Sequence, residues 1–488
     1  MNDEHPNDTD AHPIRIAVIG SGPAGFYAAG HLLNEPTGRF EVDMLERLPT
    51  PWGLVRSGVA PDHPKIKSVT RIYEKTAAHR RFRFFGNVCF GEHIFREDLL
   101  AHYHAIVYAT GSAIDRPLGV PGEELPGSYP ATEFVGWYNG HPDHRDLELA
   151  LDSAERAVVI GNGNVAIDVA RMLSLTRSEL APTDIADHAL EVLEHNHISE
   201  IVIVGRRGPL QASFTNPELR ELGELLDADV IVDPAELDRA LAVEDPDATP
   251  TAKRNVEILR EYATREPRVR RRRIVLRFLL SPVALLGDPS QGVTGVELVH
   301  NELSPDSEGT PRARTTDEHE TIPAGLVFRA IGYLGIPLPG VPFDQRRGVI
   351  PNVDGRVVEP STMATLPGEY VVGWIKRGPS GVIGTNKKDA QQTVDAILAD
   401  LPTSTNGHGS PPTPPSLSDA ATVESLLRTR QPDLVTYAGW SEIDRHERAL
   451  GEPAGRPRVK LTRIEEMLRI AASQDPSEDL PDFPREPR

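Results

Sequence analysis

Two glycine-rich turns constrain this chain more than any other feature of its sequence. GSGPAG at 20–25 follows the apolar run RIAVIG and opens the helix-forming stretch GFYAAGHLLNE. GNGNVA at 161–166 follows RAVVIG and opens NVAIDVARMLS in the same way. A tight turn between a buried parallel strand and a helix directs backbone N–H groups and the helix dipole at a pyrophosphate. The sequence therefore predicts an α/β protein with two Rossmann-like dinucleotide-binding domains.

The first turn has the residues of a site for an unphosphorylated ribose. Gly20 permits the tight turn, Gly22 lets the backbone approach the pyrophosphate, and Gly25 allows the helix to pack closely on the strand. Glu46 ends the next strand, FEVDMLER, where a carboxylate accepts hydrogen bonds from ribose hydroxyls. The alternative is a glycine turn that binds nothing. We expect this turn to bind FAD.

The second turn differs at the end of its next strand. EIVIVGRRG has Arg206 and Arg207 at the position where an NAD site has an acid. Two guanidinium groups suit a 2′-phosphate, through charge-assisted hydrogen bonds. The alternative is a solvated basic strand end. We expect this site to prefer NADPH to NADH, and two such cofactors in one chain indicate hydride transfer.

The overall composition excludes several other classes of protein. A formal net charge of -20 argues against a nucleic-acid binder. The one cysteine, Cys89, leaves no CxxC redox pair and no cysteine set for an iron–sulfur cluster. The most apolar stretch, RIVLRFLLSPVALLG, is interrupted by Arg277 and Pro282, so no membrane span is expected. The acidic start does not match a targeting peptide, and we expect a cytoplasmic protein without metal.

Four longer motifs extend the two turns into a family pattern. They are TPWGLVRSGVAPDHPKIK (50–67), GNGNVAIDVAR (161–171), VGRRGPLQASFTNPELREL (204–222) and GWIKRGPSGVIGTNKKDAQQTV (373–394). In this order they resemble the adrenodoxin-reductase type of ferredoxin–NADP+ reductases, the bacterial members most closely. The resemblance implies that NADPH passes hydride to FAD, which gives single electrons to a separate ferredoxin. A P450 system is one candidate downstream of that ferredoxin.

The resemblance also implies a domain order, with the NADP domain inserted into a discontinuous FAD domain. The expected order is a disordered tail (1–13), the N-terminal portion of the FAD-binding domain (14–112), the NADP-binding domain (113–332), the remainder of the FAD-binding domain (333–401), a Pro-rich linker (402–418), a helical segment packed on the FAD domain (419–474) and a tail (475–488).

Individual contacts follow from the same resemblance. Those implied for FAD are Ala24, Glu46, Leu54, Val88, Trp374, Gly381, Val382 and Ile383. Those implied for NADP are Asn162, Gly163, Asn164, Val165, Arg206, Arg207 and Glu218, with Gly381 near the nicotinamide. His63 and Glu221 match two polar residues beside the hydride-transfer site. Without the resemblance, the sequence favours a surface loop position for His63. Core packing is then as good an interpretation of Trp374 as flavin contact, and Glu218 and Glu221 could belong to a solvated helix face.

The electron acceptor leaves several questions open. A ferredoxin is usually acidic and needs a basic docking surface, for which RVRRRR (268–273) and HRRFR (79–83) are candidates. A solvated strand edge or loop is the alternative for each run. The main alternative function is an NADPH-dependent flavin oxidase or monooxygenase, and a subunit that only scaffolds a larger complex is also open. A disulfide reductase would need the missing CxxC.

Overall fold

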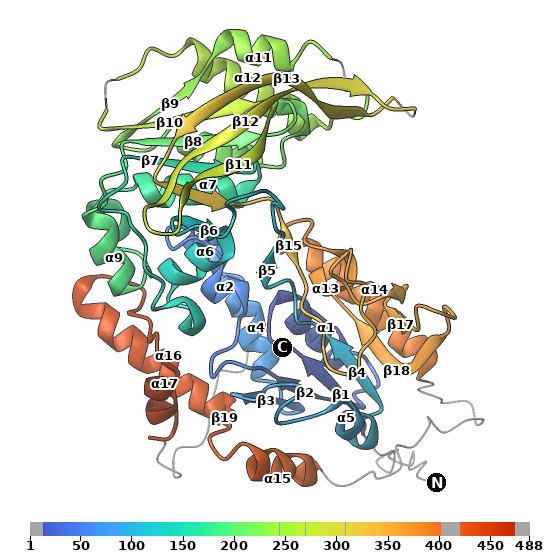
Figure 1. Ribbon diagram of the computed structural model, residues 1–488. Helices are drawn as coiled ribbons and strands as arrows, with labels where there is room; N and C mark the ends of the chain where they lie inside the picture. The colour runs from blue at the N-terminus through green and yellow to red at the C-terminus, as the bar shows by residue number, and fades with distance from the viewer. Residues whose placement is uncertain (1–12, 244, 269, 308, 402–419, 474–488) are drawn as a thin grey trace, which may run out of the picture.

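Two α/β units and a helical segment make up the protein (Figure 1). The computed structural model describes residues 13–401, apart from 244, 269 and 308, and residues 420–473. The expected Pro-rich linker and both expected tails, apart from Pro13, lie outside the described residues. The expected α/β class with two dinucleotide-binding units is confirmed, because each turn lies between a parallel strand and a helix.

The first unit is built around a sheet in the order β16-β17-β18-β4-β1-β2-β3-β19. Its strands are β1 (Ile14–Ile19), β2 (Phe40–Leu45), β3 (Phe82–Gly86), β4 (Ala105–Tyr108), β16 (Asn352–Val353), β17 (Arg356–Val358), β18 (Thr365–Val371) and β19 (Val435–Thr436). Strands β3, β2, β1, β4 and β18 are parallel. The sheet therefore joins three segments that are far apart in the sequence.

Helices of the first unit cover this sheet. They are α1 (Pro23–Leu33), α2 (Leu54–Ser57), α3 (Pro64–Lys67), α4 (Thr70–Ala77), α5 (Arg96–His102), α13 (Trp374–Arg377) and α14 (Thr385–Asp400). Apolar side chains of α1 and α14, such as Phe26 and Val394, share one core with the inward face of β1. The helix α14 begins at the polar pair Thr385–Asn386, and polar residues of this kind are common at a helix start.

The second unit has an entirely parallel sheet in the order β6-β14-β7-β8-β10-β9. These strands are β6 (Ser128–Pro130), β7 (Arg156–Ile160), β8 (Glu200–Gly205), β9 (Ala228–Val232), β10 (Arg272–Phe278) and β14 (Leu326–Arg329). Its helices are α6 (Ala131–Asn139), η1 (Pro142–His144), α7 (Asn164–Ser174), α8 (Arg177–Leu180), α9 (Asp187–Glu194), η2 (Pro209–Gln211), α10 (Asn216–Leu222), α11 (Pro234–Ala240) and α12 (Pro250–Thr264). The stretch PTDIADHALEVLEHN, between the second glycine turn and β8, contains α9.

A three-stranded antiparallel sheet in this unit was not anticipated from the sequence. It consists of β11 (Leu280–Asp288), β12 (Gly292–Pro305) and β13 (Pro311–Pro323). Its residues Val296, Leu298 and Ile322 share a core with Val158 and Val204 of the parallel sheet. This antiparallel layer therefore buries the face of the parallel sheet that the helices leave open.

The chain crosses between the units on two short paired strands. β5 (Ile114–Asp115) leads into the second unit, and β15 (Tyr333–Leu334) leads back into the first. They pair in antiparallel fashion, with Tyr333 opposite Asp115.

The C-terminal segment contacts both units. It contains α15 (Ala420–Arg430), β19, α16 (Tyr437–Gly451), η3 (Glu452–Ala454) and α17 (Ile464–Ala471). β19 pairs with β3 of the first unit, and Arg456 forms an ion pair with Asp187 at the start of α9. The sequence led us to expect packing on the FAD domain, and the structure adds the contact with the second unit. Among the described helices, none has the length and apolar character of a membrane span.

Candidate functional site

The first glycine turn combines a closely packed backbone with an open position. Gly20 has a φ of +104°, and a Cβ there would lie 2.7 Å from the carbonyl oxygen of Ala109. A Cβ on Gly25 would collide with the carbonyl oxygen of Gly20. At Gly22, the N-cap of α1, no atom of the described chain lies within 4 Å of such a Cβ. The outer glycines therefore form the turn, while Gly22 leaves room for a phosphate at the helix N-terminus.

Glu46 lies directly beside this turn. Its Oε2 accepts hydrogen bonds from the backbone N of Ser21 (3.0 Å) and from Ser21 Oγ (2.7 Å). The backbone N of Val88 donates to the carbonyl oxygen of Glu46 at 2.9 Å. Hydrogen bonds thus join the strand end, the turn and Val88, and the carboxylate lies at the strand end where the sequence predicts a ribose contact.

The loop before α2 closes over the first turn. The backbone N of Trp52 donates to the carbonyl oxygen of Ser21 at 3.2 Å. Gly53 has a φ of +49°, and a Cβ on it would lie 2.9 Å from Cα of Gly22. The next residue, Leu54, has an exposed side chain. The motif WGL therefore has an exposed apolar side chain directly after the glycine that packs on the turn.

A third segment reaches the turn from the far end of the first unit. A Cβ on Gly373 would lie 2.5 Å from Cβ of Ala24, and the N of Gly373 donates to Asp389 Oδ2 at 2.6 Å. The buried Nε1 of Trp374 has no hydrogen-bond partner within the described chain. Its ring centroid lies 5.8 Å from that of Tyr333. An open phosphate position and an unpaired indole N–H fit a bound dinucleotide with polar ring atoms.

The loop that follows leaves several side chains accessible. Gly381 and Val382 are exposed, and Ile383 is half-buried against the core of the first unit. Gly381 has a φ of +78°, which a side-chain-bearing residue adopts only with strain. The chain then enters α14, so the helix N-terminus follows directly on this glycine loop.

The second glycine turn organises a neighbouring loop. A Cβ on Gly161 would collide with the carbonyl oxygen of Ala330, whereas Gly163, the N-cap of α7, is open. The carbonyl oxygen of Asn162 accepts from the N of Ser213 at 3.0 Å. Oδ1 of Asn164 accepts from the N of Thr215 at 2.8 Å. The next residue, Val165, packs against the core of the unit.

Arg206 and Arg207 follow β8 beside this turn. Arg206 is exposed and Arg207 is half-buried. Burial lowers the pKa of Arg207, and the positive charges of Arg206 and Arg312 lower it further. Nδ2 of Asn301, on β12, donates to the carbonyl oxygen of Arg206 at 2.9 Å. Sequence reasoning missed Arg312 and Asn301, because no local pattern links β12 and β13 to this strand end.

His63 and Glu221 come together from different units. His63 Nε2 lies 2.9 Å from Glu221 Oε2, although the residues are 158 positions apart. Burial lowers the pKa of His63, but the hydrogen bond to Glu221 and the negative charges of Asp168 and Asp62 together outweigh burial and raise the pKa overall. The same hydrogen bond lowers the pKa of Glu221. On the same helix, α10, the buried Oε2 of Glu218 has no partner among the described residues.

A buried arginine that the sequence analysis did not single out supports this pair. Nε of Arg171 lies 3.5 Å from Glu221 Oε2, and its guanidinium also pairs with Asp62 and Asp168. Burial raises the pKa of Asp168 to about 6. A signal was present, because Asp62 precedes His63 in PDHPKIK and the other two residues stand in GNGNVAIDVAR.

Some arginines of the two basic runs proposed for docking make contacts within the protein. Arg272 is 3% exposed and donates to the carbonyl oxygen of Ile198 at 3.0 Å. Arg273 pairs with Glu200 at 2.7 Å. In the other run, Arg83 pairs with Asp43 at 2.6 Å. Reversing the charge of Arg272 would therefore disturb the fold and would not test docking.

Comparison with known proteins agrees with this architecture. A family model described as pyridine nucleotide-disulphide oxidoreductase matches residues 14–204. The NADPH-ferredoxin reductase FprA of Mycobacterium tuberculosis is 54% identical over 465 residues, which cover 94% of this chain and 99% of the relative. The mitochondrial NADPH:adrenodoxin oxidoreductase of Arabidopsis thaliana is 39% identical over 477 residues, 96% of this chain and 97% of the relative.

A solved structure gives the same result. Mycobacterium tuberculosis FprA in complex with NADPH superposes with a TM-score of 0.89 at 52% identity, over 95% of this chain and 100% of that chain. The disulphide chemistry in the family model's description needs a cysteine pair, which this chain lacks. The chain belongs to the adrenodoxin-reductase-type family of ferredoxin–NADP+ reductases.

Proposed function

We propose that this protein is a flavoprotein that carries electrons from NADPH, by way of FAD, to a ferredoxin-type iron–sulfur protein. The contact between His63 and Glu221 carries the proposal, because it joins the two dinucleotide sites across the units. Relatives named NADPH-ferredoxin reductase and NADPH:adrenodoxin oxidoreductase support it. The activity is that of an oxidoreductase of the ferredoxin–NADP+ reductase type.

We assign FAD to the first turn and NADP(H) to the second. The residues that would hold FAD are Gly20, Gly22, Ala24, Gly25, Glu46, Leu54, Val88, Trp374, Gly381, Val382 and Ile383. Those that would hold NADP(H) are Asn162, Gly163, Asn164, Val165, Arg206, Arg207 and Glu218. The donor sets support this division, since a carboxylate suits a free ribose hydroxyl and two guanidinium groups suit a 2′-phosphate. The FAD domain would comprise 14–112 and 333–401, and the NADP domain 113–332.

FAD and NADPH bound at these residues would supply the hydride-transfer and single-electron chemistry. The chain's own contribution is positioning and electrostatics. Glu221 keeps the imidazole of His63 in one orientation and favours its protonated form. Arg171 in turn holds the Glu221 carboxylate. His63 and Glu221 thus form a hydrogen-bonded polar pair between the two units, and this pair would orient the nicotinamide.

For the electron acceptor we propose a class of protein and no individual partner. A one-electron iron–sulfur carrier of ferredoxin type is the acceptor, and a P450 system downstream of it is one candidate use of the electrons. We also propose a cytoplasmic location, because a chain with a single cysteine needs no disulfide and suits a reducing compartment.

A visible spectrum under anaerobic conditions tests this function. The purified protein is expected to be yellow, to bleach faster with NADPH than with NADH, and to recover its colour when oxidised ferredoxin is added. Bleaching that only oxygen reverses would favour a flavin oxidase or monooxygenase. Equal rates with NADPH and NADH would contradict the role assigned to Arg206 and Arg207.

A further inference from the structure

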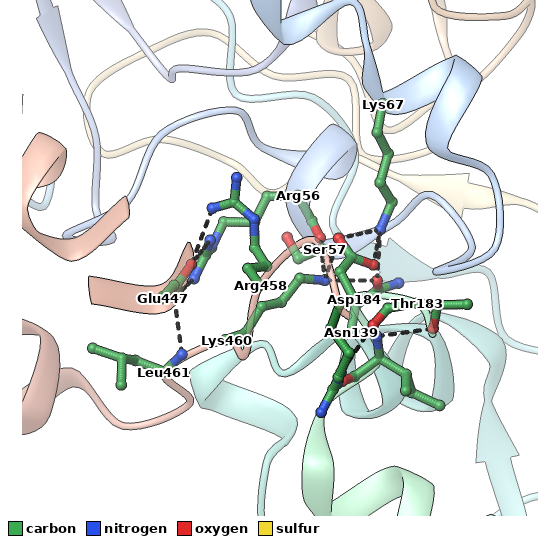
Figure 2. A network of polar contacts seen from close by, with 12 residues as sticks. Arg56, Ser57, Lys67, Asn139, Thr183, Asp184, Glu447, Arg458, Lys460 and Leu461 are labelled. Atoms are coloured by element: carbon green, nitrogen blue, oxygen red, sulfur yellow. Dashed lines mark hydrogen bonds and ion pairs between the residues drawn. The ribbon is translucent and has the colours of Figure 1, made fainter. Parts of the chain in front are cut away.

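A buried cluster of charged side chains joins the C-terminal segment to both units, and the proposed function has not used it. We call it the ionic junction (Figure 2). Its members are Arg56, Lys67, Asn139, Asp184, Glu447, Arg458 and Lys460. Arg56 and Lys67 belong to the first unit, Asn139 and Asp184 to the second, and the other three to the C-terminal segment.

Glu447, on α16, is the centre of one half of the ionic junction. Its side chain is fully buried, and both carboxylate oxygens accept from Arg56, at 2.5 and 2.8 Å. Arg458 and the backbone N of Leu461 donate to the same carboxylate at 3.1 and 2.8 Å. Burial would raise the pKa of Glu447, but the two guanidinium groups lower it. The carboxylate is therefore charged and saturated with donors.

Asp184 is the centre of the other half. Lys67 Nζ lies 2.6 and 2.9 Å from its two oxygens, and Lys460 Nζ lies 3.4 Å from Oδ2. Burial would raise the pKa of Asp184, but the two ammonium groups lower it to about 2. Lys460 Nζ also donates to Asn139 Oδ1 (3.1 Å) and to the carbonyl oxygen of Arg56 (3.0 Å). Lys460 thus connects the two halves.

The ionic junction holds one functional segment, residues 52–67, at Arg56 and at Lys67. Arg56 lies in α2, directly after the loop that closes over the first glycine turn. Lys67 ends α3, whose N-cap is His63. The proposed flavin contact Leu54 lies two residues before Arg56, and the proposed nicotinamide contact His63 lies between Arg56 and Lys67.

Stability alone is a weak reason for such a cluster. Burying several charges has a large desolvation cost, and apolar side chains of similar volume often stabilise a fold equally well. Charged groups with fixed donors and acceptors do impose one geometry, since any displacement leaves a buried charge unpaired.

We propose that Lys460 and Glu447 are positioning residues for hydride transfer, which fix residues 52–67 against the second unit and so set where His63 lies relative to bound nicotinamide. The inference rests on the proposed function, because it uses the assigned role of His63. The C-terminal segment is then part of the active-site architecture through its contacts with residues 52–67.

The test compares Lys460→Met with Arg456→Met in the FAD-bound protein. Arg456 is a matched control, because it also ties the C-terminal segment to the second unit. It donates to the carbonyl oxygen of Thr183 at 3.0 Å and pairs with Asp187 at 2.5 Å. Its side-chain hydrogen bonds within the described chain go to the second unit, on both sides of Asp184, and not to residues 52–67. Its loss therefore weakens the contact between the C-terminal segment and the second unit but keeps the hydrogen bonds of Lys460 with Arg56 and Asn139.

Two readouts separate positioning from general stability. Backbone hydrogen–deuterium exchange in peptides that cover 52–67 should increase in Lys460→Met and stay at the unaltered level in Arg456→Met. The rate of flavin reduction at saturating NADPH should fall about 10- to 100-fold in Lys460→Met, since a misplacement of about 1 Å has an effect of this size. The dissociation constant of NADP+ should stay within about twofold, because Arg206 and Arg207 lie at the other end of the nucleotide.

Other results would overturn the proposal. Equal exchange and equal flavin reduction in the two variants would do so, as would a lower melting temperature with an unchanged rate. Should Lys460→Met fail to fold, Asn139→Ala removes an acceptor of the ionic junction and keeps its charges, and the same two readouts decide. Failure of the proposed function itself would be visible in the unaltered protein, as an absence of flavin reduction by NADPH.

Discussion

Replacing Arg207 by alanine should remove most of the preference for NADPH over NADH. Arg207 is half-buried at the end of β8, and its positive charge lies near those of Arg206 and Arg312. A 2′-phosphate would neutralise this concentration of charge, whereas NADH offers only a hydroxyl at that point. The substitution should therefore weaken NADPH binding alone.

The expected size follows from the exposure of the two side chains. A hydrogen bond to a charged group contributes about 1.5–3 kcal/mol, and a half-buried guanidinium such as Arg207 belongs in the upper part of that range. A loss of about 2–3 kcal/mol corresponds to a rise of about 30- to 150-fold in KM for NADPH. Arg206 is exposed and its contribution is screened, so Arg206→Ala should lose about 1 kcal/mol, or about fivefold.

The assay is steady-state reduction of an artificial one-electron acceptor, with NADPH and NADH each titrated. Arg314→Ala is the control, since Arg314 is an exposed arginine on the same strand as Arg312. The melting temperature of Arg207→Ala should not fall, because the substitution relieves repulsion among three like charges. An equal rise in KM for both nucleotides, or a larger effect at Arg206 than at Arg207, would refute the reasoning.

Three further predictions concern the supports of the two sites. Asn301→Ala removes the hydrogen bond to the carbonyl oxygen of Arg206, and KM for NADPH but not NADH should rise about fivefold, for a loss of about 1 kcal/mol. Gly53→Ala places a Cβ 2.9 Å from Cα of Gly22 in the first glycine turn, at a φ of +49° that alanine adopts only with strain. The ratio of flavin to protein after gel filtration should therefore fall, and an unchanged ratio would contradict the close packing of this loop. The His63–Glu221 pair raises the pKa of His63, so the stabilisation of the fold that depends on protonated His63 is complete below about pH 6.5 and is lost as the pH rises through the raised pKa. The pair also lowers the pKa of Glu221, so the stabilisation that depends on ionised Glu221 is complete above about pH 4.5 and is lost as the pH falls through the lowered pKa. The melting temperature of His63→Gln should therefore differ most from the unaltered protein between these values, with FAD still bound, and a difference independent of pH would count against an ionised pair.

Several elements were predictable because their signals are local. The glycines of both turns, the strands before them and the helix at 385–400 all follow from residues within one or two turns of the backbone. The antiparallel layer of β11, β12 and β13 was not predictable in the same way, because its place depends on pairing and on the apolar face that it covers. The role of Arg272 was also missed, since it is buried only because Ile198, Asn196 and Asp227 lie around it.

The sequence by itself determined that this protein has two glycine turns between a strand and a helix, with an acid at the next strand end in one unit and two arginines in the other, because turn geometry and strand-end chemistry depend on a few adjacent residues. Only the tertiary structure decided which distant residues meet. His63 reaches Glu221 across 158 positions, and Arg56 reaches Glu447 across 391. Such contacts depend on how the two units and the C-terminal segment pack, since a charged side chain is buried only where a partner from another segment satisfies it.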